Sequence, residues 1–122
     1  MVLGFLLILV NGCKKDNNLT PDVPKSTAKE VSNLQMNSAT LNGTVNANGF
    51  STTVVFEYGL TTNYGDTAIA TPNPITGNSN TGVKASINNL LANTIYHFRL
   101  KTWNAVGESY SRDMSFTTLG QG

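Results

Sequence analysis

Side chains that could carry out chemistry are few in this sequence. It has one cysteine, Cys13, and one histidine, His97, so it contains neither a Cys-x-x-Cys pair nor a two-histidine metal site. It also lacks a nucleophile elbow and a glycine-rich phosphate loop, and its seven acidic residues show no spacing that suggests a glycosidase pair. The sequence therefore predicts no catalytic residue, no metal site and no cofactor, and we expect that the protein is not an enzyme.

Cys13 follows the apolar run VLGFLLILV at residues 2–10. This run is shorter than the roughly 20 residues that a transmembrane helix needs, and it is typical of a secretory signal. The segment Leu9 to Cys13, LVNGC, resembles the lipobox of bacterial lipoproteins. The resemblance implies that residues 1–12 are a signal peptide and that Cys13 becomes an acylated first residue. Acyl chains such as palmitate, at about 0.8 kcal/mol per buried methylene, would hold the domain on a membrane.

The alternative for Cys13 is an unmodified thiol in an ordinary signal peptide. Against it stands the polar, proline-containing stretch that follows, which cannot pack and which we interpret as a flexible tether over residues 13–26. The letters CKKDNN also resemble the start of Bacteroidetes lipoproteins. This resemblance implies an outer-membrane or cell-surface location in a bacterial envelope.

Composition argues for one small all-β domain. The chain has 122 residues and a formal net charge of +1, and its basic residues are scattered, so we expect no nucleic-acid partner. After the signal, short alternating segments separated by turn signals such as Asn48-Gly49 predict seven antiparallel strands in a β-sandwich. The predicted strands span residues 27–34, 38–47, 52–60, 66–71, 81–88, 94–104 and 108–118.

The sixth predicted strand and its flanks, LLANTIYHFRLKTWNAVG at Leu90 to Gly107, resemble the fibronectin type III pattern. The segments VVFEYG and SFTT match the family as well, so the resemblance covers residues 27–119 and leaves 120–122 as a tail. It implies an immunoglobulin-like sandwich and a structural tyrosine corner, in which the Tyr96 hydroxyl bonds backbone near Leu90. We expect a monomer.

Alternation divides the strands into two faces. It places Tyr96, Phe98 and Leu100 inside, where side chains of neighbouring strands can meet them, and it leaves Thr40 and Glu57 facing water. The family commonly has a core tryptophan where this sequence has Gly43. We expect Phe56 or Phe98 to fill the resulting space, or the two sheets to approach each other.

His97, Arg99, Lys101 and Trp103, which we call the 97–103 stripe, alternate with the inward residues and are expected to face outward. Glu57 and Asp113 are the acids expected across neighbouring strands. One interpretation is a solvated, salt-bridged sheet surface, with Trp103 shielding its own loop. The other is a docking surface for an anionic glycan or a partner protein, with Trp103 as its anchor.

Two further segments attract attention. Asp66-Thr67-Ala68 resembles an O-glycosylation signal of Bacteroidetes envelope proteins, which makes Thr67 a candidate modification site. The segment from Thr71 to Asn80 is long and polar, and we expect a mobile loop there.

Two functions remain open at this stage. The first is a non-catalytic, lipid-anchored envelope module for adhesion or for contact with an unknown protein or glycan. The second is a passive spacer in a longer extracellular protein, such as a carbohydrate-active one, whose downstream part lies beyond Gly122. Fold analogy alone does not choose between them.

Overall fold

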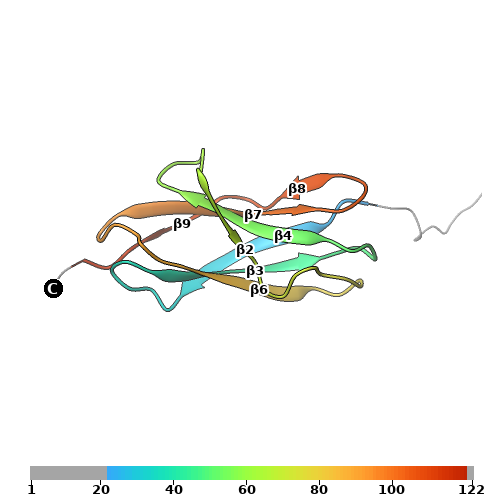
Figure 1. Cartoon of the computed structure of the whole chain (residues 1–122), viewed down its shortest axis with the longest axis horizontal. Helices are drawn as coiled ribbons and strands as arrows, with labels where there is room; N and C mark the ends of the chain where they lie inside the picture. Colours follow the sequence, from blue (N-terminus) through green and yellow to red (C-terminus); the bar gives the residue numbers. More distant parts are fainter. Residues whose placement is uncertain (1–21, 121–122) are drawn as a thin grey trace, which may run out of the picture.

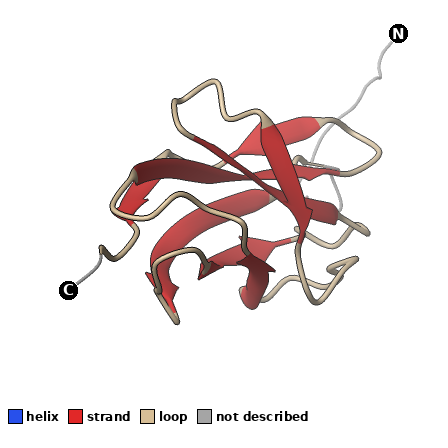
Figure 2. Cartoon of the chain, turned by 60° about the vertical axis from the view of Figure 1, so that its left-hand side comes forward, coloured by secondary structure: helices blue, strands red, loops and turns tan. Residues whose placement is uncertain are grey.

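The computed structural model describes residues 22–120, which form two antiparallel sheets packed face to face and contain no helix (Figures 1 and 2). The three-stranded sheet has the order β2-β3-β6, and the five-stranded sheet has the order β5-β4-β7-β8 with β9 also paired to β7. The strands are β2 (Lys25–Ser32), β3 (Ala39–Asn46), β4 (Thr53–Gly59), β5 (Asp66–Ile69), β6 (Thr81–Ile87), β7 (Ile95–Trp103), β8 (Glu108–Tyr110) and β9 (Met114–Thr117). The predicted immunoglobulin-like sandwich is confirmed, with eight strands in place of seven.

The extra strand arises because the predicted strand 108–118 is broken at Ser111. Its two parts, β8 and β9, pair with opposite ends of β7. At the break, the backbone N–H of Ser111 donates to the Leu100 carbonyl at 3.0 Å, while the Ser111 hydroxyl accepts from the Leu100 N–H at 2.8 Å. A side chain thus replaces a backbone partner in the ladder, so β7 keeps both hydrogen bonds of Leu100 while its partner strand is interrupted.

The core lies between the two sheets and follows the predicted alternation. Phe56, Phe98 and Leu100 are fully buried in the five-stranded sheet, and Leu41 and Val45 oppose them from β3. Neighbouring aromatic rings contact one another, with centroid separations of 6.2 Å for Phe56–Phe98 and 6.0 Å for Phe98–Phe116. At about 1.5–3 kcal/mol for each large buried side chain, this apolar cluster is the main source of stability.

Gly43 and Leu100 show how the core is filled without a tryptophan. A Cβ atom built on Gly43 would collide with Cδ1 of Leu100 and would lie 2.9 Å from the Thr27 carbonyl oxygen. Leu100 therefore occupies the space above Gly43, and the expectation that Phe56 or Phe98 would fill it was wrong. Leu100 is suited to this position because it faces inward on the central strand β7, and Gly43 offers no side chain to oppose it.

Two other expectations were wrong in detail. Thr40 is only 7% exposed, since Asn33 at the end of β2 lies over it with its amide nitrogen 3.4 Å from the Thr40 hydroxyl. The segment 71–80 is anchored to the fold, because Ile75 is buried and exchanges two backbone hydrogen bonds of 2.9 Å with Thr52. The Asn73 side chain adds bonds to the backbone of Val54.

The Tyr96 hydroxyl accepts a hydrogen bond of 2.8 Å from the backbone N–H of Leu91. This is the geometry of a tyrosine corner, and it ties the loop between β6 and β7 to the strand that follows. Leu90 is buried in the core beside it.

The chain enters the sandwich at the end that holds the turn between β3 and β4. Residues Asn48 and Gly49 form this turn with positive φ values of 55° and 86°, and they connect strands of different sheets. The Asn48 amide donates to the Val23 carbonyl at 2.8 Å, and the Asn104 amide donates to the Asp22 carbonyl at 2.6 Å. Residues 22–24 are thereby fixed against the fold before β2 begins at Lys25.

Candidate contact surface on the five-stranded sheet

All four residues of the 97–103 stripe lie on the outer face of the five-stranded sheet. Within β7 they are partly exposed, while Tyr96, Phe98 and Leu100 between them are buried. The register places Thr53 opposite Trp103, Glu57 opposite Arg99 and Gly59 opposite His97 on the neighbouring strand β4. The stripe therefore runs along the middle of this face.

Each basic side chain of the stripe has an acidic partner. Arg99 Nε lies 2.7 Å from Glu57 Oε1, His97 Nδ1 lies 2.9 Å from Asp113 Oδ2, and Lys101 Nζ lies 3.6 Å from Glu108 Oε2. Glu57 and Asp113 are the partners expected from the sequence. Because these pairs are partly exposed, each is worth at most about 1 kcal/mol of stability. Their larger effect is to neutralise the charge of the surface.

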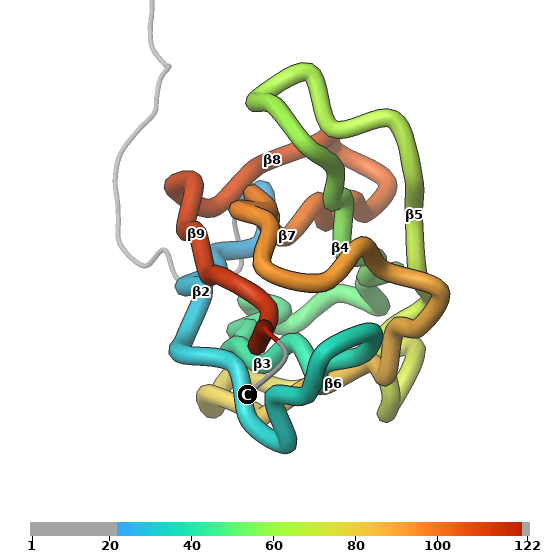
Figure 3. The backbone as a smooth tube through the Cα atoms, turned by 90° about the vertical axis from the view of Figure 1, so that its left-hand side faces the viewer, coloured from blue at the N-terminus to red at the C-terminus, as the bar shows by residue number. Residues whose placement is uncertain are grey.

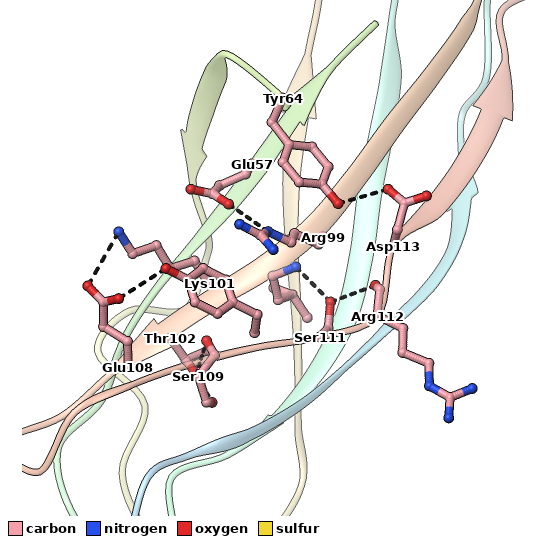
Figure 4. A network of polar contacts seen from close by, with 12 residues as sticks. Glu57, Tyr64, Arg99, Lys101, Thr102, Glu108, Ser109, Ser111, Arg112 and Asp113 are labelled. Atoms are coloured by element: carbon pink, nitrogen blue, oxygen red, sulfur yellow. Dashed lines mark hydrogen bonds and ion pairs between the residues drawn. The ribbon is translucent and has the colours of Figure 1, made fainter. Parts of the chain in front are cut away.

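Two tyrosines complete the surface around Arg99. The guanidinium carbon lies 4.0 Å from the ring centroid of Tyr110 and 4.7 Å from that of Tyr64, so the cation is held between two aromatic faces. Both phenols donate hydrogen bonds to acids: Tyr64 to Asp113 at 2.9 Å and Tyr110 to Glu108 at 3.0 Å. Figure 4 shows these contacts side by side. They hold in place side chains from three strands, β4, β7 and β8, and from the two connections that carry Tyr64 and Asp113.

Hydrogen bonding and burial keep the two phenols protonated. Burial, reinforced by the hydrogen bond to Asp113, raises the pKa of Tyr64 to about 12. The hydrogen bond to Glu108 raises the pKa of Tyr110 in the same direction. A phenol with a raised pKa is a poor base and a poor nucleophile at neutral pH. Tyr64 therefore holds the Asp113 carboxylate in place and is not itself a reactive group.

A row of mostly apolar side chains crosses the same face. Pairing places Ile69, Val55, Lys101 and Tyr110 side by side on β5, β4, β7 and β8. Ile69 is 73% exposed and Tyr110 is 44% exposed. Trp103 is partly buried next to this row, with Lys101 Nζ 5.5 Å from its ring centroid. The outer face thus combines exposed apolar groups with charges that neutralise one another.

Sequence reasoning identified the stripe but missed Tyr64, Tyr110 and Ile69. Alternation within 108–118 could have placed Tyr110, since it faces outward across from Lys101. Tyr64 has no such signal. It reaches the face from the turn after β4 with a φ of 60°, and a turn residue's direction does not follow from strand periodicity.

The remaining predicted positions lie elsewhere. Thr67 is exposed on β5, opposite Glu57, and so stands at the margin of the same face. Cys13 lies outside the described residues. Among residues 22–120, no cluster of three or more His, Cys, Asp or Glu side chains could hold a metal ion. The same part of the chain contains no helix long and apolar enough to cross a membrane.

Comparisons with known proteins bear on the fold. No protein-family model matches the chain, and no curated protein matches it. Among solved structures, a longer form of the sensor domain of the anti-sigma factor RsgI4 from Pseudobacteroides cellulosolvens is 21% identical, with a TM-score of 0.57 over 81% of this chain and 92% of that one. A shorter form of the same domain is also 21% identical, with a TM-score of 0.58 over 84% and 100%.

A third similar structure is the fibronectin type III domain of human fibronectin type III domain containing protein 3. It is 20% identical and has a TM-score of 0.50, covering 90% of this chain and 94% of that one. At such identities the likeness concerns the fold alone. The chain has a fibronectin type III-like fold.

Proposed function

We propose that the protein is a non-catalytic recognition module of a bacterial cell envelope, held on the membrane by lipid on Cys13, and that it contacts a partner protein through the outer face of its five-stranded sheet. The row Ile69–Val55–Lys101–Tyr110, in which three apolar or aromatic side chains accompany an ion-paired lysine, carries the proposal. An exposed isoleucine and a tyrosine stacked on an arginine form the kind of group that supplies most of the binding energy at protein interfaces.

The charge arrangement favours a protein over an anionic glycan. An anionic ligand needs basic side chains that are available to it, and all three basic side chains of the stripe already have acids within 4.0 Å. Binding such a ligand would require these pairs to break. A partner protein can instead cover the exposed apolar groups without breaking these pairs.

The fold comparison supports a recognition role without specifying a ligand. A similar fold serves as the sensor domain of the anti-sigma factor RsgI4. The position of residues 22–24, where the chain enters the sandwich, also supports the proposal. Residues 22–24 are fixed at the end with Asn48 and Asn104, so a lipid on Cys13 would tether the domain from that end. The outer face would then stand to the side of the tether, open to neighbouring molecules.

A passive spacer is the second candidate. The closed network of ion pairs and phenol hydrogen bonds favours it, because a surface whose polar groups satisfy one another is stable without any partner. In that case the exposed Ile69 has no role.

Site-specific crosslinking separates the two candidates. A photoreactive residue at position 69 in the full chain, expressed in its own membranes, should give a protein adduct of defined mass. The matched control is position 84, because Lys84 is exposed on the outer face of the opposite sheet, on its edge strand β6 and across from Asn42. The adduct at position 69 should disappear when Trp103→Ala is added. Equal adducts from both positions, or none from position 69, would favour the spacer.

Intact mass of the membrane-extracted protein tests the anchor and Thr67 together. A mass of residues 13–122 plus acyl chains supports lipidation of Cys13, and an unmodified mass rejects it. Additional sugar mass that vanishes in Thr67→Ala supports the proposed O-glycan. Thr67 and Ile69 share one face of β5, so such a glycan would cover part of the proposed contact surface.

A further inference from the structure

A polar groove opens on the side of the sandwich, between β5 and β6. β5 pairs with β4 as far as Ile69, and Thr71 then exchanges backbone hydrogen bonds of 2.9 and 3.0 Å with Lys84 of β6. The chain thus crosses from one sheet toward the other after β5, along one side of the molecule (Figure 3). From this bridge, the two strands diverge and leave a groove of about 420 Å³.

Most of the residues that line the groove are polar, and they come from both sheets. Tyr58, Asp66, Ser86, Asn88 and Asn89 are among them, and Ala68, Ile87 and Leu90 form the apolar part. The segment that carries the two asparagines is held in place, because the Leu90 N–H donates to the Asn37 carbonyl at 3.0 Å and the Asn37 amide donates to the Leu90 carbonyl at 2.7 Å. The lining is therefore positioned by the fold.

These polar groups differ from those of the outer face in having no partners. Within residues 22–120, the side chains of Tyr58, Asp66, Ser86, Asn88 and Asn89 make no hydrogen bond or ion pair, whereas the outer face forms a closed network. Burial, followed by the nearby Asp66 carboxylate, raises the pKa of Tyr58, so its phenol stays protonated and can donate. The groove thus presents a hydrogen-bond donor, a carboxylate acceptor and two amides that do both.

The chemistry of the lining excludes several ligand classes. Asp66 is the only charged residue that lines the groove, so an anion would be repelled. A divalent cation prefers several oxygen ligands with more than one carboxylate, and no group of three acids, histidines or cysteines exists in the described part of the chain. An apolar ligand would leave the carboxylate and the amides without partners.

We propose that this groove binds a neutral saccharide. Vicinal sugar hydroxyls donate to a carboxylate and both donate to and accept from an amide, which matches Asp66, Asn88 and Asn89. The ring of Tyr58 offers an apolar surface for sugar C–H groups. The volume falls in the range of about 300–1,000 Å³ that is usual for small-molecule sites. The proposal does not depend on the outer face, which lies on a different side of the sandwich.

Chemical-shift mapping tests it on the full chain, ¹⁵N-labelled and held in a detergent without a sugar head group. The probes are glucose, galactose, mannose, xylose and N-acetylglucosamine, with glucuronic acid and Ca²⁺ alone for comparison. At least one neutral sugar should shift the amides of residues 66–68 and 86–90 in a saturable way. Asp66→Ala and Asn88→Ala should each weaken binding by about tenfold, the effect of losing one good hydrogen bond. Asn80→Ala, an exposed asparagine in the loop before β6, should leave it unchanged.

Several results would overturn the proposal. These are the absence of saturable shifts with every neutral sugar at its highest soluble concentration, stronger binding of glucuronic acid, or shifts at the groove produced by Ca²⁺ alone. Sugar-induced shifts centred on Trp103 and Tyr110 would also overturn it, since they would place the saccharide on the outer face. Because the two variants remove different polar groups, unfolding of one leaves the other as a test.

Discussion

The close approach of Gly43 to Leu100 makes Gly43→Ala a sharp test of the packing. The new methyl group would collide with Leu100 Cδ1 and lie 2.9 Å from the Thr27 carbonyl oxygen, which is closer than carbon and oxygen normally approach. Leu100 is 0% exposed and cannot swing into solvent. Overpacking of this kind costs about 1–3 kcal/mol, so we predict that Gly43→Ala lowers the free energy of unfolding. In an uncrowded strand position, replacing glycine by alanine would have the opposite effect.

A double-mutant cycle isolates the cause. Leu100→Ala alone should cost about 2–5 kcal/mol, because it leaves a cavity in the core. When the two changes are combined, the Gly43→Ala methyl group enters the space that Leu100 vacates. We therefore expect the double variant to be more stable than the sum of the single effects predicts, by about 0.5–3 kcal/mol.

Urea unfolding at 25 °C, followed by tryptophan fluorescence, gives the required free energies. Each kcal/mol also shifts the melting temperature of a domain of this size by about 4–8 °C, which provides an independent check. If the free energy of unfolding of Gly43→Ala lies within about 0.5 kcal/mol of the parent value, position 43 has room for a side chain and the prediction is wrong. Single effects that add without coupling would also contradict it, because Leu100 would then not be the group that fills the space above Gly43.

Three other changes follow from the structure. Tyr96→Phe should lower the free energy of unfolding by about 1–3 kcal/mol, measured in urea, because it strands a backbone N–H of the β6–β7 loop; an unchanged midpoint would show that this bond is dispensable. Ser111→Ala should cost a similar amount, since the buried Leu100 N–H loses its acceptor, and Ser111→Thr should recover most of it in the same assay. Tyr64 should titrate near pH 12 by ultraviolet absorbance; its folded pKa lies above the unfolded value of 10, so its stabilising contribution is complete below pH 10 and is lost as the pH rises through 12. Tyr64→Phe should remove that part of the alkaline destabilisation, and a phenol titrating near 10 would contradict the assignment.

Periodicity was sufficient for the sandwich but not for its interruptions. The alternation placed Phe98 and Leu100 on the inner face of β7 and the 97–103 stripe on its outer face, because successive side chains of a strand point to opposite sides. The break at Ser111 was not predictable in this way. There, a hydroxyl takes the place of a backbone group, and residues on either side of the break still look like one continuous strand. The same limit hid Ile75, whose burial depends on backbone pairing with Thr52.

The candidate surface was predictable only in part, for a related reason. Pairs such as Arg99–Glu57 join residues of adjacent strands, and a correct register finds them. Asp113 was also expected, although it lies in the connection between β8 and β9. Tyr64 was not expected, because the direction of a side chain in a connection depends on local backbone conformation that a sequence pattern does not specify. The polar groove could not be predicted from the sequence, because it results from the crossing of the chain after β5 toward the three-stranded sheet.

Crosslinking from positions 69 and 84 decides whether the outer face of the five-stranded sheet contacts a partner protein. If the outer face of the five-stranded sheet is a contact surface, a photoreactive group at position 69 gives a specific protein adduct in the native membrane, position 84 gives none, and Trp103→Ala removes the adduct. Equal labelling from the two sheets, or no specific adduct from position 69, would show that this face is not a contact surface.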